Sequence, residues 1–380
     1  MTTWFTAADC DLEDFRLVCE QKTELSDYPH AIDVVDNVLI YPGSSKDRQD
    51  LRSELVRALM DGPGVVVFRG AFEPAVVDRA TAVFEDLIAA QKAAGMTGGD
   101  HFAKPGANDR VWGALDKFAL RDPAAFAAYY DNDTLALVCQ AWLGAAYQVT
   151  SQVNVVNPGG QAQVAHRDYH LGFMDLERAA AYPAQVHALS PALTLQGAVA
   201  HVDMPVETGP TLYLPHSQKY GAGYLAYHDP AFTAYFDEHH VQLALGKGDA
   251  AFFNPAVFHG AGTNRTPDVR RMANLLQVSS AFGRAMETVD TTAVCRAVHP
   301  VLRRWRAEGA GQRAIGNVVA AAAEGYPFPT NLDLDQPVGS LVPQTEAELL
   351  LRALDDDWET SRLVAALDAQ QARRRSQVGG

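Results

Sequence analysis

Two histidines and one aspartate have the residue types and spacing of a metal site. His166 and Asp168 stand two positions apart within residues 164–170, and His259 lies far downstream within residues 258–265. Side chains two residues apart on an extended chain point to the same side, so His166 and Asp168 can reach a single ion. Two imidazoles and one carboxylate on one face of an octahedron leave three positions open, as in non-haem Fe(II) oxygenases. The pattern predicts a metal centre with His259 as the third ligand.

This interpretation depends on the residues that accompany the pattern. With twelve histidines in 380 residues, a lone His-x-Asp arises by chance fairly often, and a His–carboxylate hydrogen bond on a surface loop would explain it better. Arg270 follows His259 by eleven positions, where the next strand of an antiparallel barrel could return a guanidinium to the metal. Its fixed fork of N–H donors suits the far carboxylate of a dicarboxylate. Strand alternation places Arg270 and Arg271 on opposite faces, so only one of them can point inward.

These residues belong to a longer series of motifs. The series comprises residues 64–70, His166-x-Asp168, residues 208–217, residues 247–249 and residues 259–270. In this order, over roughly residues 60–285, the chain resembles the phytanoyl-CoA dioxygenase family of Fe(II)/2-oxoglutarate-dependent oxygenases. The resemblance implies Fe(II) on His166, Asp168 and His259, with 2-oxoglutarate and O₂ as cosubstrates. It also implies oxidation of a small-molecule substrate with release of succinate and CO₂.

The resemblance favours Arg270 as the partner of the distal 2-oxoglutarate carboxylate, with Arg271 as the alternative. Many relatives place a small hydroxyl residue two positions after the second histidine to assist this arginine. Here that position carries Ala261, so the contact is lost or comes from elsewhere. Thr194 and Thr211 are the candidates for supplying it.

Further residues are candidates for binding the cosubstrate or the substrate. Gln152 and Asn154 share one face of a predicted strand, and in similar proteins such amides contact the metal-chelating end of 2-oxoglutarate; pairing within the sheet is the alternative. Residues 95–117 form a long glycine-containing loop, either a lid or a solvated connector. His170 shares the face of His166 if the strand continues. The substrate candidates are Tyr169, His170, Lys104, Arg110, Trp112 and His216.

Hydrophobic periodicity predicts the elements that position these residues. Helices are expected over residues 46–60, 74–88, 135–143, 293–306, 312–323 and 346–369. Strands are expected over residues 64–68, 147–156, 192–202, 211–214, 241–245, 250–253 and 272–279. Short strands separated by Gly/Pro turns indicate a cupin-like jelly roll, the double-stranded β-helix. Residues 220–240 interrupt this rhythm and are expected to lean over the mouth of the site.

The predicted fold class is mainly β with flanking α. We expect a single domain over residues 1–380, in which a β-helix core of residues 146–283 is braced by an N-terminal helical part, residues 1–145, and a C-terminal helical extension, residues 284–380. No internal repeat is evident in the sequence.

Composition excludes several classes of partner. The chain has 48% hydrophobic and 20% charged residues, as ordinary globular enzymes do, and a net charge of −15 disfavours nucleic acid or an anionic membrane as a partner. Four dispersed cysteines without a C-x-x-C pair indicate a reduced chain. The first residues lack the features of a signal peptide, and no apolar run approaches membrane-spanning length. We expect a cytoplasmic protein with a small-molecule substrate, and a homodimer is left open.

Together these features predict an Fe(II)/2-oxoglutarate dioxygenase that oxidises an unactivated C–H bond. Halogenating relatives replace the carboxylate ligand by a small residue, whereas this chain retains Asp168. We therefore expect hydroxylation first, desaturation or ring closure second, and no native chlorination. The first alternative is a cupin-like isomerase or hydrolase with Zn(II) or Mn(II) on the same triad, for which an inward arginine has no evident purpose. The second is a non-catalytic barrel that binds a small ligand, against which the complete triad argues.

Overall fold

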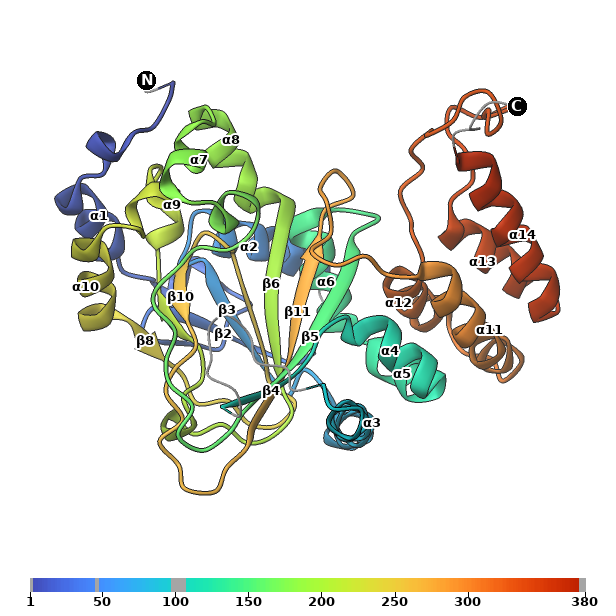
Figure 1. Cartoon of the computed structure of the whole chain (residues 1–380), viewed down its shortest axis with the longest axis horizontal. Helices are drawn as coiled ribbons and strands as arrows, with labels where there is room; N and C mark the ends of the chain where they lie inside the picture. The colour runs from blue at the N-terminus through green and yellow to red at the C-terminus, as the bar shows by residue number, and fades with distance from the viewer. Residues whose placement is uncertain (1–2, 45–47, 97–106, 376–380) are drawn as a thin grey trace.

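The computed structural model describes residues 3–44, 48–96 and 107–375. Within these ranges the strands form an eight-stranded sheet in the order β1-β2-β3-β9-β6-β11-β5-β4 and a three-stranded sheet in the order β10-β7-β8 (Figure 1). The strands are β1 (Asp33–Val35), β2 (Val38–Pro42), β3 (Val65–Arg69), β4 (Asn108–Val111), β5 (Gln148–Val156), β6 (Thr194–Ala200), β7 (Leu212–Leu214), β8 (Val241–Gln242), β9 (Ala250–Phe253), β10 (Phe258–Gly260) and β11 (Arg271–Ser279). The expected double-stranded β-helix is present at the centre of the molecule.

More of the chain is helical than extended, and the helices surround this core. The α-helices are α1 (Leu12–Cys19), α2 (Arg48–Met60), α3 (Pro74–Ala93), α4 (Ala114–Arg121), α5 (Pro123–Tyr130), α6 (Asp133–Leu143), α7 (Leu176–Ala180), α8 (Ala184–Leu189), α9 (Gly223–Ala226), α10 (Pro230–His239), α11 (Thr291–Ala307), α12 (Gln312–Ala322), α13 (Glu346–Asp355) and α14 (Thr360–Arg374). Short 3₁₀ helices lie at Ala7–Asp9, Leu25–Asp27, His170–Phe173, Ser190–Leu193, Val206–Thr208 and Ser217–Lys219. Among the helices of the described ranges, none combines the length and the apolar run that a bilayer crossing requires.

The central strand β11 shows how sequence alternation builds the two faces of the large sheet. It pairs antiparallel with both β5 and β6. Arg271, Ala273 and Gln277 face a cavity between the sheets, whereas Met272 and Val278 join the core that lies under the helices. Side chains alternate between faces with a period of two, so one strand serves the site and the core at once.

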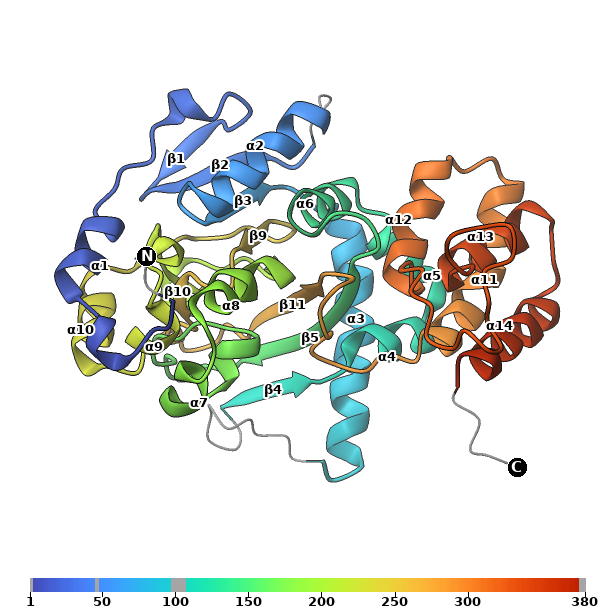
Figure 2. The same ribbon diagram turned by 90° about the horizontal axis from the view of Figure 1, so that it is seen from above.

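The helical side of the sheet contains the main hydrophobic core. Val153 of β5, Phe118 of α4, Leu302 of α11, Leu354 of α13 and Leu367 of α14 are all buried members of one cluster. Seen from above, α11 to α14 lie beyond α4 and α5, at the end of the molecule away from α1 and α10 (Figure 2). The N-terminal and C-terminal helices therefore share apolar surface with the same sheet.

A second, aromatic cluster covers the small sheet. Phe15 of α1 packs its ring against Tyr220, Phe232 of α10 and Phe258 of β10, with ring centroids 4.9 to 5.3 Å apart. All four side chains are buried. Residues 220–240, expected to lean over the site, thus mainly form α9 and α10 on the outer side of the small sheet, although Tyr227 reaches the cavity.

Several elements differ from those that the sequence predicts. Residues 108–111, expected within a loop, form the edge strand β4, which pairs with β5. Asn and Asp disfavour strands, but tertiary pairing overrides their propensity. Helices α4 and α5, together with strand β10, were not predicted. The helix expected over residues 346–369 is divided into α13 and α14 at Asp357, whose positive φ of 50° ends the first helix.

Candidate metal centre

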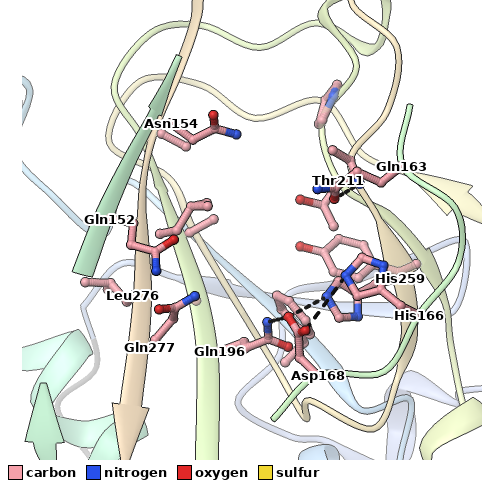
Figure 3. A pocket seen from close by; sticks show the side chains of 18 of the residues that line it. Gln152, Asn154, Gln163, His166, Asp168, Gln196, Thr211, His259, Leu276 and Gln277 are labelled. Atoms are coloured by element: carbon pink, nitrogen blue, oxygen red, sulfur yellow. Dashed lines mark hydrogen bonds and ion pairs between the residues drawn. The ribbon is translucent and has the colours of Figure 1, made fainter. Parts of the chain in front are cut away.

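His166, Asp168 and His259 converge at one end of the cavity (Figure 3). Their candidate ligand atoms all lie within 4.8 Å of one another. His166 and His259 face each other across an antiparallel bridge, in which the N–H of each donates to the carbonyl of the other at 3.0 and 3.1 Å. The two imidazole centroids are 4.5 Å apart. The backbone therefore fixes the separation of two ligands that are far apart in sequence.

Hydrogen bonds on the far side of each ring prepare both imidazoles to bind a metal. Nδ1 of His166 lies 2.8 Å from the carbonyl of Val164, and Nδ1 of His259 lies 2.9 Å from the carbonyl of Val257. A carbonyl can only accept, so each Nδ1 carries the proton and each Nε2 presents its lone pair. Fixing the tautomer in this way is typical of metal-binding histidines.

Asp168 lies between the histidines and is held by Gln196. The Nε2 of Gln196 donates to Oδ2 of Asp168 at 2.5 Å, and Nε2 of His259 lies 3.4 Å from the same oxygen. Burial raises the pKa of Asp168, but its contacts with His259 and His166 and the hydrogen bond from Gln196 outweigh burial and bring the pKa to about 2. Burial lowers the pKa of His166, and the nearby His259 ring adds to this shift. Both shifts favour the forms that bind metal, an ionised carboxylate and a neutral imidazole.

The residue between the first two ligands anchors their segment from behind. Arg167 points away from the cavity and is fully buried between the rings of Tyr224 and Phe258. Its Nη2 donates to the carbonyls of Ser217 and Tyr220 at 2.6 and 3.1 Å. The ligand segment is thereby tied to the loop that covers the small sheet.

The cavity beside the metal centre has a volume of about 430 Å³, within the range of small-molecule sites. Strands β5, β6 and β11 form one wall, and β7 and β10 contribute to the other. Among the predicted cosubstrate residues, Gln152, Asn154 and Thr211 line this cavity. Thr194 does not; its hydroxyl lies 3.5 Å from Nε2 of His170.

The prediction that Arg270 points into the site is wrong. Arg270 is 42% exposed and forms ion pairs with Glu85 at 2.8 Å and Asp109 at 3.1 Å on the outer surface. Arg271, the alternative, lines the cavity and is only 6% exposed. Burial lowers the pKa of Arg271 to about 10. Strand alternation correctly places Arg270 and Arg271 on opposite faces of the sheet. Which of the two faces the cavity is determined by how β11 pairs with its neighbouring strands.

The Nη1 atom of Arg271 is buried and has no hydrogen-bond partner among the residues that the structure describes. A buried guanidinium nitrogen left unsatisfied is costly, so this atom indicates a site for an anionic ligand.

The predicted substrate residues fall into three groups. Arg110 and Trp112 line the cavity, with the Arg110 guanidinium 4.7 Å from the centre of a Trp112 ring. Tyr169, His170 and His216 do not line it. Lys104 lies outside the described residues, as do residues 97–106 of the expected lid loop.

The three residues that miss the cavity do so for local reasons. Tyr169 and His170 have positive φ values of 62° and 50°, so the extended segment ends after Asp168 and His170 no longer shares the face of His166. His216 is engaged elsewhere, with Nε2 3.1 Å from Thr23 Oγ1 and Nδ1 2.9 Å from Lys219 Nζ.

Sequence reasoning missed other polar residues of the cavity. Gln163, Gln196 and Gln277 line it. Gln196 and Gln277 lie on strands that the sequence predicts. Gln277 is six positions after Arg271 on one strand, so alternation would have placed both side chains on the same face of the sheet. Gln163 lies outside the regular strands, and no sequence pattern marked it.

Comparison with known proteins identifies the family. Residues 60–272 match the family model described as Phytanoyl-CoA dioxygenase (PhyH). No curated protein matches the sequence.

Several solved structures are similar to the chain at low identity. The non-heme alpha ketoglutarate dependent carbocyclase SnoK from nogalamycin biosynthesis is 20% identical, with a TM-score of 0.46 over 63% of this chain and 87% of that chain. AviO1 from Streptomyces viridochromogenes Tue57 is 17% identical, with a TM-score of 0.45 over 64% and 99%. HygX from Streptomyces hygroscopicus, with nickel and 2-oxoglutarate bound, is 14% identical, with a TM-score of 0.39 over 60% and 88%.

These structural similarities are too distant to define an activity. The family model, in contrast, matches more than half of the chain and includes all three candidate ligands. The chain therefore belongs to the phytanoyl-CoA dioxygenase family of iron- and 2-oxoglutarate-dependent enzymes, and His166, Asp168 and His259 are arranged to hold its iron.

Proposed function

We propose that this enzyme hydroxylates an unactivated C–H bond of a small-molecule substrate. The observation that supports this proposal best is one cavity that contains both a His–Asp–His triad and a buried arginine with an unsatisfied nitrogen. The triad suits a metal, and the arginine suits the far end of a dicarboxylate.

The donor set fits Fe(II). His166 and His259 would contribute Nε2, and Asp168 would contribute a carboxylate oxygen, while Gln196 keeps the carboxylate oriented. Three protein ligands leave coordination positions for small molecules. Bound iron and 2-oxoglutarate supply the oxidising chemistry, in which O₂ converts the oxoacid to succinate and CO₂ while the substrate is oxidised.

The cavity also fits 2-oxoglutarate. Arg271 would hold its distal carboxylate through charge-assisted hydrogen bonds, and burial of the guanidinium strengthens such contacts. Thr211 lines the same cavity and offers the hydroxyl that Ala261 lacks. Apolar side chains, among them Phe173, Leu275 and Met286, limit the access of water to the reacting groups.

Retention of Asp168 supports hydroxylation over chlorination, because the carboxylate fills the position that halogenating relatives leave open. Desaturation or ring closure is the second outcome consistent with the same ligands. Hydroxylation, desaturation and ring closure all need no protein residue beyond those already in the cavity.

The experiment begins with anaerobic protein, Fe(II) and 2-oxoglutarate. We expect a weak visible charge-transfer band, absent when the ligand His259 is replaced by Ala. Zn(II) retained through purification, with no band after iron loading, would instead support an isomerase or hydrolase.

Product analysis under ¹⁸O₂ in chloride buffer then determines the reaction. A product that carries one labelled oxygen supports hydroxylation, and loss of two hydrogens supports desaturation or ring closure. A chlorinated product would show that Asp168 is not a ligand.

A further inference from the structure

The cavity wall next to the metal centre carries a pair of glutamines that the proposed reaction does not use fully. Gln196 of β6 and Gln277 of β11 are directly opposite each other in the antiparallel register. Both side chains line the cavity beside Asp168 (Figure 3). Residues opposite each other on neighbouring strands have Cβ atoms about 4.5–5.5 Å apart, so the two amides can bind one ligand group together. We call Gln196 and Gln277 the amide pair.

Each member of the amide pair has a buried oxygen without a partner. Neither Oε1 atom has a hydrogen bond within the part of the chain that the structure describes. The orientation of Gln196 is fixed, because its NH₂ group donates to the Asp168 carboxylate, which can only accept. The atom of Gln196 that lacks a partner is therefore its carbonyl oxygen, Oε1. Gln277 can present either its oxygen or its NH₂ group, since an amide can be turned without changing its shape.

2-Oxoglutarate cannot satisfy these oxygens. At neutral pH its carboxylates and ketone only accept hydrogen bonds, and Gln196 Oε1 needs a donor. The Tyr169 hydroxyl also interacts with the Gln196 amide, but Oε1 still has no partner among the described residues, so we assign the donor to the substrate or to a water in the cavity.

The charges of the cavity indicate which donor fits. Among the described residues that line it, Asp168 is the only carboxylate, while Arg110 and Arg271 bring two guanidinium groups. An ammonium group would donate to Gln196 but would be repelled by Arg110, whereas Arg271 would be paired with 2-oxoglutarate. A hydroxyl is neutral, donates to one amide and can accept from the other.

We infer that the substrate is a neutral alcohol or polyol, with a hydroxyl group bound by the amide pair. This inference rests on the proposed function, because it takes the metal centre to be the reacting end of the cavity. Gln196 touches Asp168, so a hydroxyl on the amide pair lies next to the metal centre. The pair is then a specificity determinant that places the hydroxyl-bearing part of the substrate near the reacting groups.

The test uses three probes with the same ring: cis-cyclohexane-1,2-diol, cyclohexylamine and cyclohexanecarboxylate. Each is titrated into the anaerobic protein loaded with Fe(II) and 2-oxoglutarate, and its effect on the visible band is followed. The diol should bind at least tenfold more tightly than the other two. Equal binding of all three, or preference for the amine or the carboxylate, would overturn the inference.

Variants then test the role of the amide pair. Gln277→Leu should weaken diol binding about tenfold, because it replaces the hydrogen-bonding amide by an apolar side chain of similar size. Gln140→Leu, the same change at an exposed position of α6, should leave diol binding unchanged. Gln277→Glu keeps an acceptor and adds a negative charge, so it should admit cyclohexylamine. Unchanged probe selectivity in both Gln277 variants would overturn the assignment.

The two proposals fail in different ways. Absence of the visible band would contradict the iron and 2-oxoglutarate function. Saturation-transfer NMR with the same three probes and the metal-free protein would still show whether the cavity prefers the diol, and the Gln277 variants apply there too. A normal band without diol preference would contradict the hydroxyl inference alone.

Discussion

Two adjacent arginines show how sharply the environment changes from one residue to the next. Arg270 is solvent-exposed and paired with Glu85 and Asp109, whereas Arg271 is buried in the cavity with an unsatisfied nitrogen. Only a desolvated guanidinium can contribute strongly to binding of a dicarboxylate, because water and ions screen the exposed one.

Arg271→Ala should therefore weaken 2-oxoglutarate binding by about 1.5–3 kcal/mol, the usual contribution of a charge-assisted hydrogen bond. Iron binding should be spared, since Arg271 is not among the three candidate ligands. Arg270→Ala is the matched control and should change 2-oxoglutarate affinity little. Titration of 2-oxoglutarate, followed by the anaerobic visible band, measures the affinity of both variants. A larger loss of affinity in Arg270→Ala would mean that Arg270, and not Arg271, points into the cavity.

Among the elements, the segment that carries His166 and Asp168 depends on a close approach to α9. Gly223 begins α9, and a Cβ atom added there would lie 1.9 Å from Cζ of Arg167. The buried guanidinium therefore fills the space that a side chain would need. Any larger residue must displace Arg167, which lies between two metal ligands in sequence.

Gly223→Ala should destabilise the fold by about 1–3 kcal/mol, as overpacking of a core usually does, and should also weaken metal binding. Gly221→Ala is the control in the same loop, because its added Cβ would approach no closer than 3.2 Å, at the ring edge of Phe5. Urea unfolding and Co(II) titration measure the two effects. Equal behaviour of both variants would show that Arg167 has room to move without disturbing the ligands.

For the whole molecule, a buried histidine links helices to the central sheet. Nδ1 of His201 lies 2.8 Å from Oγ1 of Thr81 on α3, and Nε2 lies 3.1 Å from the hydroxyl of Tyr129 on α5. Thr81 donates its own proton to the carbonyl of Val77, so it accepts from His201 Nδ1, and Tyr129 donates to Nε2. This pattern requires a neutral ring, and burial lowers the pKa of His201 to about 3.

Stability should consequently fall as the pH drops. The unfolded chain protonates this histidine below about 6.5, whereas the native protein resists protonation until about pH 3. His201 therefore stabilises the native state above pH 6.5, and this contribution is lost progressively from pH 6.5 towards 3.

Between pH 7 and 5 the loss from His201 should be roughly 2 kcal/mol, at 1.4 kcal/mol per unit below the unfolded pKa. His201→Gln should show a correspondingly smaller pH dependence in urea unfolding. His239→Gln, at an exposed position of α10, should keep the slope of the parent protein. The same slope in all three proteins would mean that His201 does not carry the effect.

The sequence alone determined the triad and most of the strands. His166 and Asp168 are two positions apart, so local backbone geometry already brings their side chains together. His259 was the candidate third ligand, and the resemblance strengthened that assignment. Strands such as β5, β9 and β11 could be predicted because their alternation or continuous apolar character arises from burial of whole faces. The terminal helices followed from apolar residues at helical spacing, with a break at Asp357 that local periodicity did not reveal.

Tertiary structure decided what periodicity leaves open. Alternation states that Arg270 and Arg271 face opposite ways, but the inner face is defined only when β11 pairs with β5 and β6 and the small sheet packs opposite. The positive φ values after Asp168 likewise turned His170 away from a face that an extended chain would have shared with His166. Gln196 meets Gln277 and Asp168 only through strand register and folding of the ligand segment. Such encounters depend on contacts between distant segments, which local sequence patterns do not encode.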